Sequence, residues 1–97
     1  MFRERKKAES VTARSEITIA NELGLHARPA AEFARCAHRF RSEIFIVKNT
    51  TRFSATSLIE ILRANLEKGE TAVLEAHGPD AQEAVSALLK LASEFRD

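Results

Sequence analysis

The stretch from Gly24 to Ala31 reads Gly-Leu-His-Ala-Arg-Pro-Ala-Ala and places a histidine, His26, directly before an expected helix. The helix is expected over roughly residues 27–38, because apolar side chains recur there at the i, i+3, i+4, i+7 spacing of an amphipathic helix. These side chains are Ala30, Phe33, Ala34 and Ala37. Pro29 falls in the first turn, where its missing N–H breaks no intrahelical bond. His26 is therefore expected at a helix N-terminus.

The rest of the chain divides into short segments with the periods of strands and helices. Strands are expected over residues 15–20, 43–48, 51–55 and 71–76, and further helices over residues 57–65 and 80–95. The resulting order, β-α-β-β-α-β-α, predicts an α+β fold. We expect an open-faced β-sandwich, in which a four-stranded sheet carries three helices on one face and leaves the other face partly exposed to solvent.

Local capping patterns mark the starts of the second and third helices. Ser57 and Glu60 have the spacing of a capping box, in which each side chain satisfies a free backbone N–H at a helix start. Asp80 begins a second cap-like pattern. Asn65 is expected to end the second helix, because Asn tolerates the left-handed backbone conformation that closes many helices.

Length and composition indicate one small domain. The chain has 97 residues, of which 44% are hydrophobic, and this is too short to divide into two domains. Residues 1–13 are mostly charged or small and polar, so we expect a flexible charged extension followed by a folded domain over residues 14–97. No apolar run resembles a secretory signal or a membrane span. Cys36 is the single cysteine, which favours a reducing, cytoplasmic location and gives no metal-ligand pair.

The distribution of charge argues against nucleic acid as a partner. The formal net charge is +1, and residues 1–14 hold five Lys and Arg side chains against two acidic ones. The remaining residues hold ten basic against twelve acidic side chains. A nucleic-acid-binding domain would usually be basic, with interleaved aromatic residues.

The residues around His26 suit the binding of a phosphoryl group. A helix N-terminus presents unpaired N–H groups and a partial positive charge, which favour an anion and a neutral, nucleophilic imidazole. Arg28 adds a permanently charged donor fork that matches phosphate oxygens. A plainer interpretation is that His26 only caps the helix and Arg28 is a solvated surface charge. The chain would then be a non-catalytic interaction module that binds a partner through its open sheet face.

The motif Gly-Leu-His-Ala-Arg-Pro-Ala-Ala resembles the active-site motif of the HPr family of the phosphoenolpyruvate-dependent sugar phosphotransferase system, and the resemblance extends over residues 14–97. It implies an open-faced β-sandwich that carries phosphate and is not itself an enzyme. By this resemblance, enzyme I phosphorylates His26 on Nδ1, Arg28 stabilises the phosphate, and the group passes to a IIA-type acceptor protein. It implies no cofactor and no metal, and we expect a monomer.

The resemblance also suggests a regulatory residue and a partner surface. Ser57 stands where many HPr proteins carry a serine that an HPr kinase/phosphorylase modifies, and a transcriptional regulator would then be a further partner. Ser57 could equally serve only as a helix cap. Leu58, Ile61 and Leu62 are expected to form an apolar partner-binding surface, and Arg35 a basic rim that attracts acidic partners.

Some residues depart from the family pattern. Glu60 would repel a phosphate on Ser57, and Leu23 replaces a small polar residue before the motif glycine. The sequence also leaves open a purely regulatory branch. In that alternative, the phosphorylation state of His26 controls nitrogen metabolism or transcription through partner binding, and no sugar permease lies downstream.

Overall fold

The computed structural model describes residues 11–96, which form seven elements in the expected order. They are β1 (Thr12–Thr18), α2 (Ala27–Ala37), β2 (Glu43–Lys48), β3 (Thr51–Ser54), α3 (Leu58–Ala64), β4 (Thr71–His77) and α4 (Ala81–Ser93). Most of the expected N-terminal extension, residues 1–10, lies outside the described residues.

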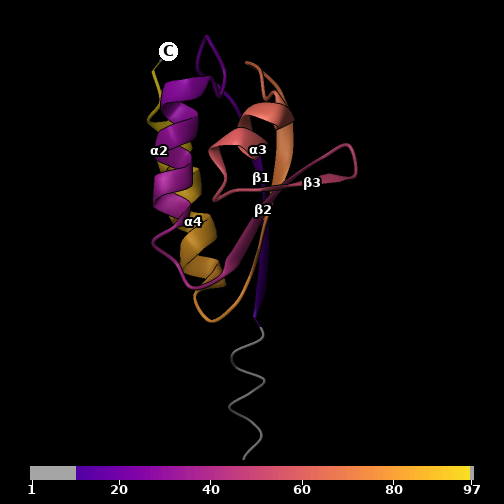
Figure 1. Ribbon diagram of the computed structural model, residues 1–97, viewed down its shortest axis with the longest axis vertical. Helices are drawn as coiled ribbons and strands as arrows, with labels where there is room; N and C mark the ends of the chain where they lie inside the picture. The colour runs from indigo at the N-terminus through magenta and orange to yellow at the C-terminus, as the bar shows by residue number, and fades with distance from the viewer. Residues whose placement is uncertain (1–10, 97) are drawn as a thin grey trace, which may run out of the picture.

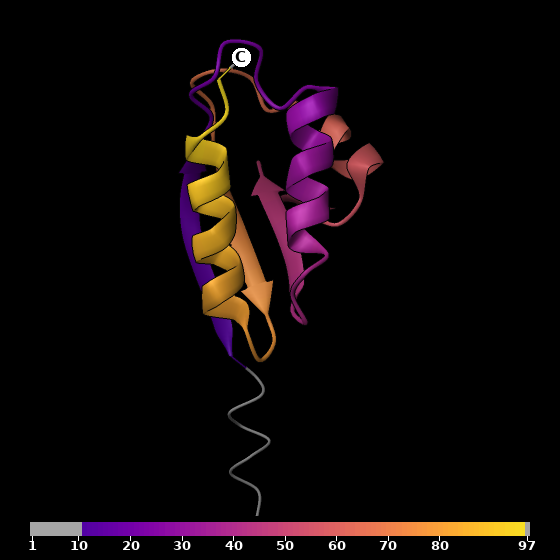
Figure 2. The same ribbon diagram turned by 90° about the vertical axis from the view of Figure 1, so that its left-hand side faces the viewer.

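The four strands form one antiparallel sheet in the order β1-β4-β2-β3. Figures 1 and 2 show the helices on one side of this sheet, with α4 along β1 and β4, and α3 beside β3. The open-faced β-sandwich expected from the order of elements is confirmed.

Strand β1 begins earlier than expected. Thr12 and Ala13 pair with His77 and Ala76 of β4, so the folded domain includes two residues before the expected boundary at Arg14. The polar composition before Arg14 concealed this part of the strand, because only one face of β1 is buried and its other face is polar.

The core lies between the inner face of the sheet and the three helices. Alternate strand residues point into it, as the two-residue period of a strand requires. Those buried on the inner face are Ala13, Ile17, Ile44, Ile46, Ala72, Leu74 and Ala76. Phe33 of α2, Ile61 of α3 and Leu88 of α4 meet them from the helices and are fully buried.

The open face of the sheet carries a buried carboxylate, Glu75, near its centre. Arg14, its partner in β1, donates hydrogen bonds to Glu75 Oε2 from Nε at 3.2 Å and from Nη2 at 2.7 Å. Arg52 lies 3.5 Å from Glu75 Oε1 and stacks over the ring of Phe45. These guanidinium groups hold the pKa of the Glu75 carboxyl below its ordinary value, and the hydrogen bond from Arg14 is the largest cause.

Two of the expected capping contacts differ in the structure. Ser57 Oγ accepts the N–H of Glu60 as expected, but Glu60 Oε1 accepts the N–H of Ser54 at 2.7 Å and does not return to Ser57. Asp80 makes no cap to its own helix, and its carboxylate accepts the backbone N–H of Arg41. In both cases tertiary folding brings a donor that the local pattern does not contain.

Candidate functional site

His26 is the residue that precedes the first turn of α2. Its backbone is extended, with φ −80° and ψ −172°, and its side chain makes no capping hydrogen bond to the helix. The backbone carbonyl of His26 accepts the N–H of Ala30. The imidazole is therefore not used as a helix cap, and it lies at the end of α2 where the first-turn N–H groups have no intrahelical acceptor.

Arg28 lies in that same first turn. Its side chain is exposed and makes no hydrogen bond or ion pair with another residue in the range 11–96. It borders a hollow of about 280 Å³ that is also lined by Phe95 and Arg96. Figures 1 and 2 show the C-terminal end of the chain at the same end of the molecule as the loop that precedes α2. The structure thus leaves the guanidinium of Arg28 available to an anion.

The loop before His26 is packed tightly against the loop that follows α3. Gly24 has φ +70°, a conformation that favours glycine, and a Cβ built on it would lie only 2.4 Å from the carbonyl oxygen of Leu66. The N–H of the next residue, Leu25, donates to that same carbonyl at 2.9 Å. Glycine is therefore required here both by its backbone conformation and by the close approach of Leu66.

Lys48, at the end of β2, supports the loop against which Gly24 packs. Its ammonium group donates to the carbonyl oxygens of Ala64 and Asn65, both at 2.9 Å, and to Glu70 Oε1 at 3.0 Å. Asn65 has φ 51° and ψ 58°, the expected left-handed conformation at the end of α3. Lys48 was not among the residues singled out by the sequence, because its acceptors lie 16 to 22 residues further along the chain.

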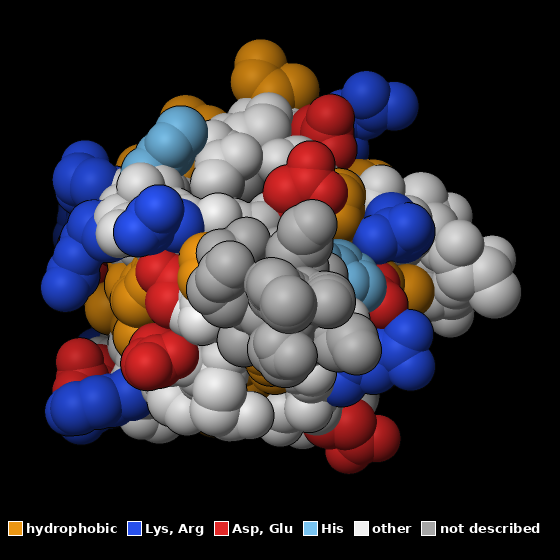
Figure 3. All heavy atoms as spheres, turned by 90° about the horizontal axis from the view of Figure 1, so that it is seen from below, with side chains coloured by type: hydrophobic (Ala, Val, Ile, Leu, Met, Phe, Trp, Pro, Cys, Tyr) orange, Lys and Arg blue, Asp and Glu red, His pale blue; other side chains and the backbone are white. Residues whose placement is uncertain are grey.

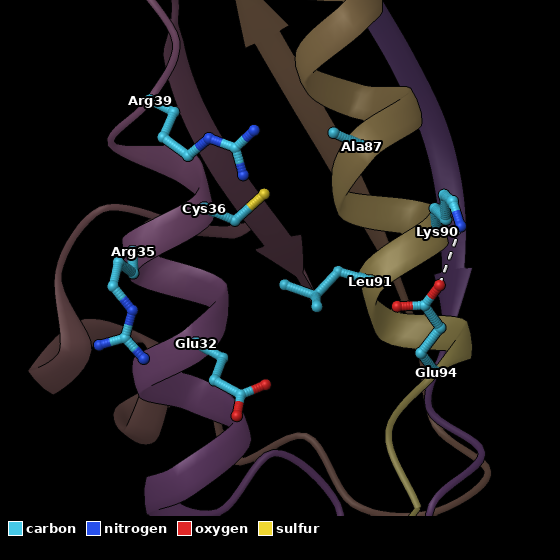
Figure 4. A pocket seen from close by; sticks show the side chains of 8 residues that line it. All are labelled: Glu32, Arg35, Cys36, Arg39, Ala87, Lys90, Leu91 and Glu94. Carbon is cyan, nitrogen blue, oxygen red and sulfur yellow. Dashed lines mark hydrogen bonds and ion pairs between the residues drawn. The ribbon is translucent and has the colours of Figure 1, made fainter.

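Arg35, expected to form a basic rim, lies on the exposed surface of α2. It lines a groove of about 500 Å³ between α2 and α4, together with Cys36, Arg39 and Leu91. Figure 4 shows Leu91 pointing across this groove toward α2, whereas the side chain of Arg35 runs along α2 and does not cross the groove. The hollows beside Arg28 and Arg35 share Glu32, so the two arginines border one continuous side of the helix.

The expected partner surface on α3 needs one correction. Ile61 is 0% exposed and belongs to the core, so it cannot touch a partner. Leu58 and Leu62 are partly exposed as expected, and Ile59, at 67% exposed, occupies the surface position that was expected for Ile61. We call Leu58, Ile59 and Leu62 the α3 patch. Helix α3 is only seven residues long and apolar on several sides, so its periodicity does not show which side faces the core.

Ser57 lies at the start of α3, next to the α3 patch. Its hydroxyl is half-buried and accepts the N–H of Glu60 at 3.2 Å. Helix α2 is tied to the same region, because His38 Nε2 donates to the carbonyl oxygen of Thr56 at 3.0 Å. Ser57 therefore performs a capping role, whether or not it is also modified.

Figure 3 views the end opposite the loop before α2, and acidic and basic side chains are intermingled there. Within residues 11–96, no three His, Cys, Asp or Glu side chains come together as metal ligands. None of the helices in this range is long and apolar enough to cross a membrane.

Comparison with known proteins identifies the family. The family model described as "PTS HPr component phosphorylation site" matches residues 13–94. The chain belongs to the HPr family. It is 40% identical over 76 residues to "Phosphocarrier protein HPr" of Cupriavidus necator, which covers 78% of this chain and 85% of that protein. Over the same length it is also 40% identical to "Phosphocarrier protein NPr" of Shewanella violacea, covering 78% and 84%.

A solved HPr structure has the same architecture. The structure of HPr from Thermoanaerobacter tengcongensis matches with a TM-score of 0.81 and 37% identity, covering 84% of this chain and 91% of that one. The chain is thus a phosphocarrier of the phosphotransferase system. The alternative interpretation, a non-catalytic interaction module, is therefore dropped. As an HPr-family protein, it carries a phosphoryl group between proteins of this system and is not an enzyme.

Proposed function

We propose that His26 receives the phosphoryl group from phosphoenolpyruvate through enzyme I and donates it to IIA-type acceptor proteins in the cytoplasm. The observation that supports this assignment is the position of His26 at the start of α2, with a side chain that makes no helix cap. A phosphoryl group attached there would face the N–H groups of the first turn and the positive end of the helix.

The transfer itself is a displacement at phosphorus. The lone pair of His26 Nδ1 forms the new P–N bond while the bond between phosphorus and its donor breaks, and the reverse exchange passes the group to the acceptor. Arg28 contributes by placing a planar cation beside the phosphoryl oxygens, where negative charge is concentrated during transfer. The side chain is suited to this role because it is exposed and engages no acceptor among residues 11–96.

The assignment of His26 is tested by incubating the chain with enzyme I and phosphoenolpyruvate, followed by intact mass spectrometry and phosphorus NMR. One acid-labile phosphate is expected on the parent chain and none on His26→Ala. His77→Ala is the matched control, because it removes a histidine from the far end of β4. Undiminished labelling of His26→Ala would show that another residue is the acceptor.

For docking, we assign the α3 patch and Arg35 to the contact with enzyme I and IIA proteins. Exposed Leu58, Ile59 and Leu62 give apolar area that a partner can bury, and Arg35 adds an exposed cation on α2. Ile59→Glu is expected to raise KM for the chain as a substrate of enzyme I about tenfold while leaving its fold intact, because the side chain is exposed. An unchanged KM would remove Ile59 from the interface.

Regulation through Ser57 is a further part of this proposal, and its position beside the α3 patch supports it. A phosphate on Ser57 would add between one and two negative charges next to this apolar surface and would weaken docking to enzyme I. An HPr kinase/phosphorylase and a transcriptional regulator are the corresponding partners. Ser57→Asp should therefore raise KM for enzyme I, whereas Ser57→Ala should change only stability. If ATP-dependent kinase does not label Ser57 and Ser57→Asp behaves as the parent, the residue is a cap alone.

The regulatory branch is the second candidate, and a specific comparison supports it. The 40% identity with NPr of Shewanella violacea equals that with HPr of Cupriavidus necator. In this case the phosphorylated state of His26 would act through partner binding, without a sugar permease downstream. Phosphorylating the chain with each enzyme I paralogue of its organism, and comparing kcat/KM, distinguishes the two branches.

A further inference from the structure

The peptide group between Gly24 and Leu25 is held at both of its polar ends. Its N–H, on Leu25, donates to the carbonyl of Leu66 at 2.9 Å. Its carbonyl oxygen, on Gly24, accepts two hydrogen bonds, one from the backbone N–H of His26 at 2.9 Å and one from Nδ2 of Asn21 at 2.7 Å. Three hydrogen bonds thus fix the plane of the peptide that leads directly into His26.

Asn21 contributes to this arrangement from inside the protein. Its side chain lies in a residue that is only 5% exposed, and it is one of three buried polar residues in the described range. Burying an amide is unfavourable unless its groups are hydrogen-bonded. The short bond to Gly24 therefore anchors the Asn21 side chain in a single orientation, and in turn anchors the carbonyl of Gly24.

The turn over residues 21–24 is closed by a backbone hydrogen bond and does not require the Asn21 side chain. The backbone N–H of Gly24 already donates to the carbonyl of Asn21 at 3.1 Å, and Gly69 donates to the carbonyl of Ile19 at 2.7 Å. What the side-chain amide adds is control over the direction of one carbonyl group. That carbonyl is the acceptor for the N–H of His26, so its direction determines how the chain enters the first turn of α2.

We propose that Asn21 is a positioning residue for phosphoryl transfer: its side-chain amide holds the Gly24 carbonyl, and through it the backbone of His26, in the orientation that presents the imidazole to the partner. The proposal rests on the proposed role of His26 as the phosphoryl acceptor. By this proposal, the position requires an amide. Aspartate has the same shape but no N–H, and its carboxylate would face the carbonyl oxygen that Asn21 now binds.

The test compares Asn21→Asp and Asn21→Ala with the parent in phosphorylation by enzyme I and phosphoenolpyruvate. Both variants are expected to lose about tenfold or more in kcat, because small displacements of a reacting group strongly reduce transfer. KM should stay within about twofold of the parent value, because the α3 patch and Arg35 are untouched. The backbone amide signal of His26 in ¹H–¹⁵N NMR should shift, reporting the altered acceptor.

Glu22→Ala is the matched control in the same turn. Glu22 is exposed, and among residues 11–96 its carboxylate pairs with the exposed Lys68 alone, at 3.0 Å, so this variant should keep the parent kcat. All rates are measured at a temperature where far-UV circular dichroism shows each variant to be folded. Asn21→Ala introduces no repulsive charge, so it serves if Asn21→Asp does not fold.

The proposal is overturned if a folded Asn21 variant transfers phosphate at the parent kcat, or if Glu22→Ala loses as much. It is also overturned if kcat falls while the His26 amide signal is unchanged. Failure of the proposed function gives a different result, because labelling would then survive in His26→Ala, whatever the behaviour of the Asn21 variants.

Discussion

Replacing Gly24 by alanine tests how closely the loop before His26 must pack against the loop after α3. Gly24 has φ +70°, and a Cβ there would lie 2.4 Å from the carbonyl oxygen of Leu66 and 2.9 Å from Cα of Glu67. Both atoms belong to the backbone, so no side-chain rotation can relieve the overlap. Gly24→Ala must therefore displace one loop from the other.

Comparison with a second glycine separates the expected loss of stability in Gly24→Ala into two parts. Gly69 also has a positive φ, +88°, but nothing lies within 4 Å of a Cβ built on it. Gly69→Ala should therefore lose only the conformational preference, about 1–2 kcal/mol. Gly24→Ala should lower the free energy of unfolding by this amount and by about 1–3 kcal/mol more, because of the forced overlap. The difference between the two variants isolates the contact with Leu66.

The assay is urea unfolding followed by far-UV circular dichroism, because the chain contains no Trp or Tyr for intrinsic fluorescence. Phosphorylation by enzyme I is measured in parallel under folding conditions. Gly24→Ala should transfer phosphate about tenfold more slowly or worse, since the displaced loop carries His26. Gly69→Ala should transfer at close to the parent rate.

Equal destabilisation by the two substitutions would refute the close packing of Gly24 against Leu66. If Gly24→Ala is strongly destabilised but transfers phosphate at the parent rate, the position of this loop does not determine the reactivity of His26.

Three further outcomes are expected. Lys48→Met should lower the free energy of unfolding, measured by urea unfolding, by about 2–3 kcal/mol, because the carbonyl oxygens of Ala64 and Asn65 lose their charged donor. An unchanged free energy of unfolding would mean that water replaces the ammonium group. Ser57→Ala should cost about 1 kcal/mol in the same assay through the lost cap. Because the pKa of Glu75 is lowered, chiefly by the hydrogen bond from Arg14, its contribution to stability is complete above the ordinary Glu pKa and is lost as pH falls through the lowered pKa. Glu75→Gln should therefore reduce the loss in free energy of unfolding that occurs as the pH is lowered. If this loss is unchanged in the variant, other titrating groups cause it.

The sequence predicted the elements and their order because most of them have one buried side and a clear period. Alternation in β1 and the apolar stripe of α2 are examples, and they locate His26 correctly at a helix start. The motif around His26 is local, so the relation of Arg28 and Pro29 to the helix could also be read directly from their spacing.

What the sequence could not supply are contacts between distant segments. The exchange of Ile61 for Ile59 on the surface of α3 depends on which side of a two-turn helix meets the sheet. The carboxylates of Glu60 and Asp80 were expected to cap their own helices, but each accepts a donor from a neighbouring segment. Likewise, Asn21 looks like an ordinary turn residue until its burial and its bond to Gly24 are known.

The carboxylate at the centre of the open sheet face has a consequence for the solubility of this fold. A bare antiparallel sheet offers a flat surface on which a second sheet could stack. Any such layer would have to remove water from Arg14 and Arg52, which are exposed, and enclose the charged Glu75 cluster completely. Enclosing an ion cluster costs several kcal/mol for each ion unless new partners are supplied. Glu75 and its two arginines thus protect the uncovered side of the domain against self-stacking, and their ion pairs link β4 to its neighbour β1 and to the edge strand β3.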